Sequence, residues 1–175
     1  MRFEKVSYPQ FEADILNTNT NMLNRWGCKN VNTIKKAWEE LRLPERGTSG
    51  SAGYDFFAPY TFELFPTKTI LIPTGIRVIL DDDKFLAVYP RSGQGFKYKV
   101  QLYNTVAIID SDYSQSENEG HIMIKMYNDS PDIDDKHILT VMQNKAFCQG
   151  IIQQYFTTED DEVAAQRNGG FGSTG

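Results

Sequence analysis

Two short segments combine residue types that phosphate chemistry requires. Residues 90–93 read Pro-Arg-Ser-Gly, so a guanidinium, a hydroxyl and a close-approaching backbone at Gly93 could together hold a phosphate. Asp110 follows the apolar run 106–109, which would fix its carboxylate at the end of a strand. Hydrolysis between phosphates needs a base that takes a proton from water and positive charge around the phosphoryl oxygens. The two segments together indicate such a site, with ordinary turn roles as the alternative.

Two further segments carry similar signals. Residues 51–55 read SAGYD, and residues 167–175 read RNGGFGSTG. The second offers the cation Arg167, backbone amides free to approach a phosphate, and Phe171, whose ring can stack on a base. Without a ligand, so glycine-rich an end is expected to be flexible.

Many short strands must position these residues. From Ser51 onward the apolar residues alternate with polar ones at the two-residue period of a sheet, and turn residues separate the runs. Strands without long intervening helices favour a closed barrel or a sandwich. The expected strands span 69–80, 84–89, 98–103, 121–127, 137–142 and 147–156.

The N-terminal part has a different pattern. A short alternating run over residues 2–8 precedes two stretches of helical spacing, residues 11–26 and 32–43, and Pro44 closes the second. The sequence therefore predicts a mainly β protein with a short helical insertion. The expected units are an opening strand (1–10), a helical insertion and linker (11–46), a β-barrel (47–158) and a flexible C-terminal arm (159–175).

Composition argues against several function classes. The chain has 175 residues and a formal net charge of −5, which does not favour a broad electrostatic grip on nucleic acid. No stretch approaches the roughly 20 apolar residues of a membrane span. The N-terminus does not resemble a secretory leader, and Cys28 and Cys148 are far apart, so we expect a cytoplasmic protein. His121 and His137 stand alone, so a zinc site is not expected.

Taken together, the motifs resemble a known family. The segments 51–55, 90–93, 104–113 and 167–175, in this order and with strands between them, resemble motifs one, two, three and five of the trimeric dUTPase family, bacterial or phage-type, and residues 147–149 stand where motif four belongs. The resemblance implies a distorted jelly-roll β-barrel and a homotrimer with active sites shared between subunits. It also implies hydrolysis of dUTP to dUMP and pyrophosphate.

The resemblance assigns catalytic roles. Asp110 would be the general base that orients water for attack on the α-phosphorus. Ser92 and the amide of Gly93 would hold phosphate oxygens, and Gln149 would also contact phosphate. Arg91 would support Asp110 across a subunit boundary. Mg²⁺ would arrive on the triphosphate and be bound mainly through its oxygens.

Other residues would select the nucleotide. By resemblance, the ring of Tyr113 packs against deoxyribose and excludes a 2′-hydroxyl; the alternative is a core aromatic. The hairpin containing Asn104 and Ile109 would bind the uracil edge, although Asn104 is also a common turn residue. Asp55 could hold a water of the Mg²⁺ ion or simply shape its turn. In the tail, Arg167 would grip the γ-phosphate, Phe171 would cover uracil, and Gly172 and Ser173 would contribute to substrate binding.

The sequence departs from the family at four points. Six residues, 114–119, lie where the family usually has one, and they are acidic. Ala107 and Ala146 replace a usual glycine and a usual arginine, and the tail spacing after Arg167 is one residue shorter. These departures put in doubt the support of motif four and the role of Arg167.

Two alternatives remain open. A dCTP deaminase relative would need a glutamate placed to activate water, and no motif for it is present. A dUTPase-fold regulatory protein would dock to a repressor or another protein partner, with the insertion and the acidic segment as candidate surfaces. Docking is compatible with catalysis.

Overall fold

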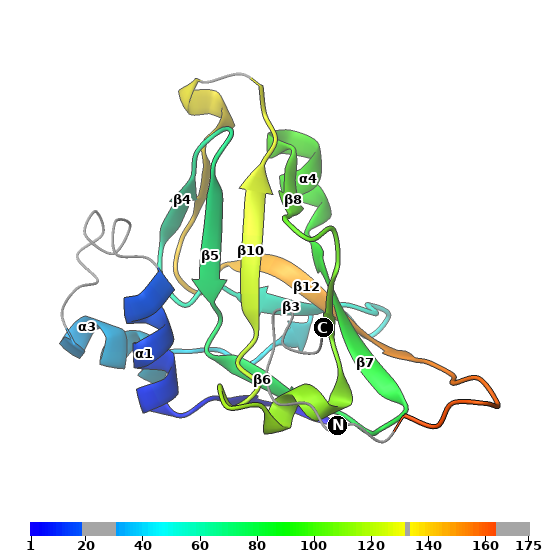
Figure 1. Cartoon of the computed structure of the whole chain (residues 1–175). Coiled ribbons are helices and arrows are strands. Elements are labelled where there is room, and N and C mark those ends of the chain that lie inside the picture. The colour runs from blue at the N-terminus through cyan, green and yellow to red at the C-terminus, as the bar shows by residue number, and fades with distance from the viewer. Residues whose placement is uncertain (19–30, 132–133, 164–175) are drawn as a thin grey trace.

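The computed structural model describes residues 1–18, 31–131 and 134–163, and the fold is mainly β (Figure 1). The strands are β1 (Arg2–Lys5), β2 (Glu45–Arg46), β3 (Tyr54–Phe57), β4 (Phe62–Leu64), β5 (Thr69–Pro73), β6 (Ile76–Ile79), β7 (Lys84–Pro90), β8 (Val100–Leu102), β9 (Ala107–Ile109), β10 (Met123–Asn128), β11 (Leu139–Val141) and β12 (Ala146–Gln154). The helices are α1 (Tyr8–Thr18), α3 (Val31–Glu39) and α4 (Ser92–Tyr98), with 3₁₀ turns η1 (Ser111–Gln115) and η2 (Asp135–His137). Within the described residues, no helix has both the length and the apolar character needed to cross a bilayer.

The described strands pair in antiparallel sheets. The largest has the order β2-β3-β12-β7-β9, and a second has the order β5-β10-β8. The strand pairs β1-β6 and β11-β4 form two further two-stranded sheets. In the largest sheet β12 lies between β3 and β7, with Gln149 opposite Asp55 on one side and Tyr89 on the other. This register sets three of the five motif segments, 51–55, 90–93 and 147–149, side by side.

Alternating residues of these strands fill one core. Leu86 and Val88 of β7, Phe147 of β12 and Ile124 of β10 are each at most 1% exposed. Cys148 is also fully buried, and burial raises the pKa of its thiol well above the usual value. Central strands with this much apolar burial give the site segments a rigid support.

The N-terminal helices share this core rather than forming a separate one. Phe11 and Ile15 of α1 and Ile34 of α3 are buried in the same cluster as the strand residues. The indole Nε1 of Trp38 donates to the carbonyl of Val6 at 2.9 Å. Figure 1 places α1 beside the ends of β5 and β6.

Several expected elements differ in the structure. The strand expected over 69–80 is divided into β5 and β6, because the chain turns at Gly75, whose φ of +75° favours glycine. Ser92 and Gly93 begin helix α4 rather than forming an isolated turn, and Tyr98, expected in a strand, ends that helix. Strands β3 and β4 were not predicted. The first expected helix, 11–26, ends at Thr18 within the described residues, and the second, 32–43, ends at Glu39.

Candidate active site

One group of motif residues meets at the end of β7. Nε of Arg91 lies 3.3 Å from Oδ1 of Asp55, and its Nη1 donates to the carbonyl of Ala146 at 3.4 Å. The side-chain amide of Gln149 donates to the carbonyl of Pro90 at 3.3 Å. A cation and an amide therefore lie together at the surface, beside the start of α4.

Gly53 lets the side chain of Gln149 lie close to the backbone of the first motif. A Cβ placed there would lie 2.7 Å from Oε1 of Gln149, a distance that Cβ atoms essentially never adopt. The close approach of the two strands lets the Gln149 amide lie against the backbone of β3. Any larger residue at position 53 would displace that amide.

The first turn of α4 presents polar groups beside Arg91. Arg91 is the N-cap residue with an extended backbone (φ −78°, ψ 141°), and its side chain does not cap the helix. The first intrahelical bonds are those from the N–H groups of Gln94 and Gly95 to the carbonyl of Arg91. The N–H groups of Ser92 and Gly93 precede them, as is usual for the start of a helix. A Cβ at Gly93 would meet nothing within 4 Å, so this turn is open to a ligand.

Asp110 lies in a separate, open pocket. It directly follows β9 and is the N-cap residue of η1, where its carbonyl accepts from the N–H of Tyr113 at 3.2 Å. The pocket measures about 620 Å³ and is lined by Asp82, Phe85, Ile108, Asp110, Ser111, Asp112 and Tyr155. Its walls combine carboxylates with aromatic and aliphatic side chains.

Strand β7 keeps Asp110 and Arg91 of one chain apart. Leu86 pairs with Ile109, so Asp110 lies beside the first residues of β7, whereas Arg91 follows its last residue. From Phe85, which lines the Asp110 pocket, to Arg91 is six residue steps. At the usual rise of a strand this is about 20 Å. The two predicted groups are therefore not brought together within a single chain.

The residues predicted to select the nucleotide lie around η1 and in the turn between β8 and β9, which belong to different sheets and do not form the expected hairpin. Asn104 is exposed in that turn, next to Thr105, whose φ is +68°. Ile109 is partly buried against the core. Tyr113 is only 6% exposed, and its hydroxyl donates to the carbonyl of His121 at 3.0 Å. Only a small part of the Tyr113 side chain is therefore accessible to a sugar.

The remaining predicted residues have different outcomes. Arg167, Phe171, Gly172 and Ser173 lie outside the described residues. Ala146 meets Arg91 through its carbonyl, so the exchange of a side chain at that position leaves this contact possible. Ala107 is 7% exposed and pairs with Val88, which accommodates its methyl group in the core.

Sequence reasoning missed part of the pocket wall. Phe85 and Tyr155 have ring centroids 6.3 Å apart, and the Tyr155 hydroxyl donates to the carbonyl of Asp82 at 2.8 Å. The predicted strand 147–156 includes Tyr155, whereas β12 ends one residue before it, at Gln154. The pairing of β12 with β7 was not predicted, and that pairing brings Tyr155 to the pocket that Asp110 lines. Across residues 1–18, 31–131 and 134–163, no three His, Cys, Asp or Glu side chains are grouped closely enough to hold a metal ion.

Comparison with known proteins identifies the family. A family model described as dUTPase matches residues 39–175. This chain belongs to the dUTPase family. The deoxyuridine 5′-triphosphate nucleotidohydrolase of Lactococcus lactis subsp. lactis (strain IL1403) is 34% identical over 138 residues, which cover 77% of this chain and 89% of that relative.

Solved structures agree with this dUTPase fold. The crystal structure of the Streptococcus mutans dUTPase has a TM-score of 0.58 and 28% identity, covering 67% of this chain and 88% of that one. A mutant dUTPase from phage phi11 of S. aureus has a TM-score of 0.57 and covers 73% of this chain and 92% of that one. At 22% identity, the phage protein supports the fold alone. The helix α1 lies before residue 39, and so outside the part of the chain that the family model matches.

Proposed function

We propose that this dUTPase-family chain hydrolyses dUTP to dUMP and pyrophosphate, with Asp110 as the general base. The observation that carries the proposal is the family match over residues 39–175, within which Asp110 directly follows strand β9 and lines an open pocket. Its carboxylate accepts a proton from a water molecule as that water attacks the α-phosphorus. The water oxygen forms the new bond, the bond to the bridging oxygen breaks, and pyrophosphate leaves.

The active site is shared between chains of a homotrimer. Support comes from the separation of about 20 Å that strand β7 imposes between Asp110 and Arg91 of one chain. Because a site needs both the base and the cation, Arg91 serves the Asp110 of a neighbouring chain. Ser92 and the amide of Gly93 bind phosphate oxygens beside it. The amide of Gln149, held at the same end of β7, donates to another phosphate oxygen.

The sugar and base are recognised near η1. Tyr113 forms a wall against the deoxyribose ring, and the segment that contains Asn104 and Ile109 binds the uracil edge. The C-terminal segment covers the bound nucleotide, with Phe171 over uracil and Arg167 on the γ-phosphate. Gly172 and Ser173 follow them along the triphosphate.

Mg²⁺ enters on the substrate. The described residues offer no cluster of acidic, His or Cys ligands, which fits an ion bound mainly by phosphate oxygens and water. Asp55, whose side chain is 24% exposed beside Arg91, would hold the ion through one of those waters. When bound, the ion neutralises charge on the triphosphate.

A pyrophosphate-release assay tests this function. Wild type and Asp110→Asn are compared on dUTP, dTTP, dCTP and UTP, with the products separated. We expect rapid release from dUTP only, and a loss of at least about 10²-fold in Asp110→Asn. Full activity in that variant would show that another group is the base, and ammonia release from dCTP would favour a deaminase.

A further inference from the structure

A closed network surrounds the hydroxyl of Tyr113. That hydroxyl donates to the carbonyl of His121 and accepts from Nδ2 of Asn118 at 2.8 Å. Oδ1 of Asn118 accepts from the N–H of Gly120 at 3.2 Å. Gly120 has a φ of +71°, and a Cβ there would lie 2.6 Å from Cα of Ser114. The segment 114–121 is therefore folded tightly back on the tyrosine.

The N-terminal region holds this segment at two points. The N–H and Oγ of Ser7 donate to the two carboxylate oxygens of Glu119, at 2.8 and 2.6 Å. Nδ1 of His121 lies 2.6 Å from Oδ2 of Asp14 in α1. Nε2 of His121 accepts from the N–H of Gly75 at 2.7 Å. Since Nε2 is an acceptor, the neutral ring carries its proton on Nδ1 and donates it to Asp14.

One partner in each of these contacts precedes the part of the chain that the family model matches. The family model matches from residue 39 onward, whereas Ser7 and Asp14 precede it, and Asp14 and His121 are 107 residues apart in sequence. The longer segment 114–119 resembles no part of the usual third motif. His121 is fully buried, so the removal of its partner would leave a polar group unsatisfied in the core.

We propose that Asp14 and Ser7 are positioning residues that hold Tyr113 in place and thereby set the discrimination between deoxyribose and ribose. This inference depends on the sugar-reading role of Tyr113 proposed above. Exclusion of a 2′-hydroxyl requires a wall that does not yield, because a mobile ring would leave room for the extra oxygen. The network supplies that rigidity through the hydroxyl end of the ring.

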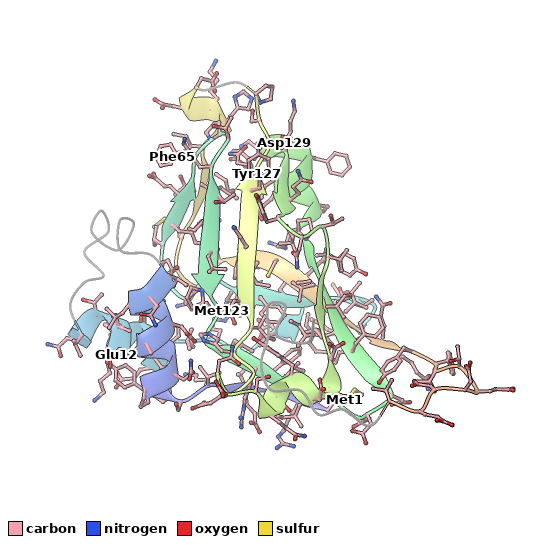
Figure 2. All side chains as sticks on the ribbon, in the orientation of Figure 1. Met1, Glu12, Phe65, Met123, Tyr127 and Asp129 are labelled. Atoms are coloured by element: carbon pink, nitrogen blue, oxygen red, sulfur yellow. The ribbon has the colours of Figure 1, made fainter. Side chains whose placement is uncertain are left out.

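The test measures kcat and KM for dUTP and UTP in the full-length enzyme. In Asp14→Ala we expect the ratio of kcat/KM for dUTP over UTP to fall about tenfold, mostly through a better KM for UTP, with kcat on dUTP nearly unchanged. Asp14→Asn keeps an oxygen that can accept from Nδ1 of His121, so it should retain the ratio. The matched control is Glu12→Ala on the same helix (Figure 2). This change removes a carboxylate that accepts a hydrogen bond from the hydroxyl of Tyr8, also in α1.

Asn118→Ala and Ser7→Ala provide independent tests if Asp14→Ala does not fold. Each removes donors outside the buried ring of His121, and each should lower the same ratio by at least about threefold. Thermal unfolding confirms that each variant is folded. An unchanged ratio of kcat/KM for dUTP over UTP in folded Asp14→Ala would overturn the inference. An unchanged ratio in both Asn118→Ala and Ser7→Ala would also overturn it. A wild-type enzyme that does not distinguish dUTP from UTP would instead contradict the proposed role of Tyr113.

Discussion

A mixture of two inactive variants can show whether the active site is shared. Asp110→Asn removes the base, and Arg91→Ala removes the cation at the other end of β7. Because β7 separates the two positions by about 20 Å, each site would take Asp110 from one chain and Arg91 from a neighbour. A trimer that contains both variants therefore has some sites with both native residues.

The expected recovery follows from counting. When the two variants are mixed equally and assemble at random, half of the chains carry Asp110 and half carry Arg91. A given site receives both with a probability of about one quarter, so the mixture should regain about one quarter of wild-type turnover.

The assay follows pyrophosphate release after the variants are unfolded together and refolded, with each variant alone as the control. Different affinity tags on the two variants confirm that mixed oligomers have formed. Activity that stays at the level of the separate variants, in confirmed mixed oligomers, would refute the shared site.

Three further predictions concern stability and the C-terminal segment. Gly150→Ala should lower the free energy of unfolding in urea by about 1–3 kcal/mol, because the new Cβ would lie 2.8 Å from a methyl carbon of the buried Leu86. The control is Gly47→Ala, because nothing lies within 4 Å of a Cβ at that position. Equal stability of the two variants would contradict the packing argument. Burial alone would raise the pKa of Asp14, but hydrogen bonds from His121 and Gln10 outweigh it and hold that pKa below 3.8. Because the native pKa is lowered, the stability that the Asp14 carboxylate contributes is present above pH 3.8 and is lost as the pH falls through the native pKa. Urea unfolding from about pH 6 to about pH 3 should therefore show a steeper loss of stability in wild type than in Asp14→Asn. Identical slopes in the two proteins would contradict this prediction. Removal of residues 167–175 should leave a folded oligomer by size-exclusion chromatography with almost no turnover, whereas undiminished pyrophosphate release would refute the covering role of this segment.

Periodicity predicted the long strands well and the short elements poorly. The alternation over residues 121–127 anticipated β10, because that strand buries one face and pairs on both edges. Strands β3 and β4 have only four and three residues, too few to establish a period of two. Ser92 and Gly93 were interpreted as a turn from their types, yet the same types also start helices.

The residue types of the candidate site could be recognised in the sequence, but their arrangement in space could not. The motif residues were recognised from several segments that occur in order along the chain. The separation of Asp110 from Arg91 depends on how β9 and β12 pair with β7, which no local pattern specifies. The bond between Asp14 and His121 joins positions 107 residues apart, and neither residue stood out on its own.

In the proposed trimer, the two ends of strand β7 would belong to two different active sites. Its first residues would lie at one active site and its last residues at the next. The three β7 strands of the trimer would therefore each connect two neighbouring active sites. Ala87 lies midway along the strand and is 1% exposed, so we expect a larger side chain there to displace its buried neighbours and to distort the strand. In a trimer of the substituted chain, every active site would then contain two altered strand ends, one from each of two chains. Every site would be formed by more than one polypeptide.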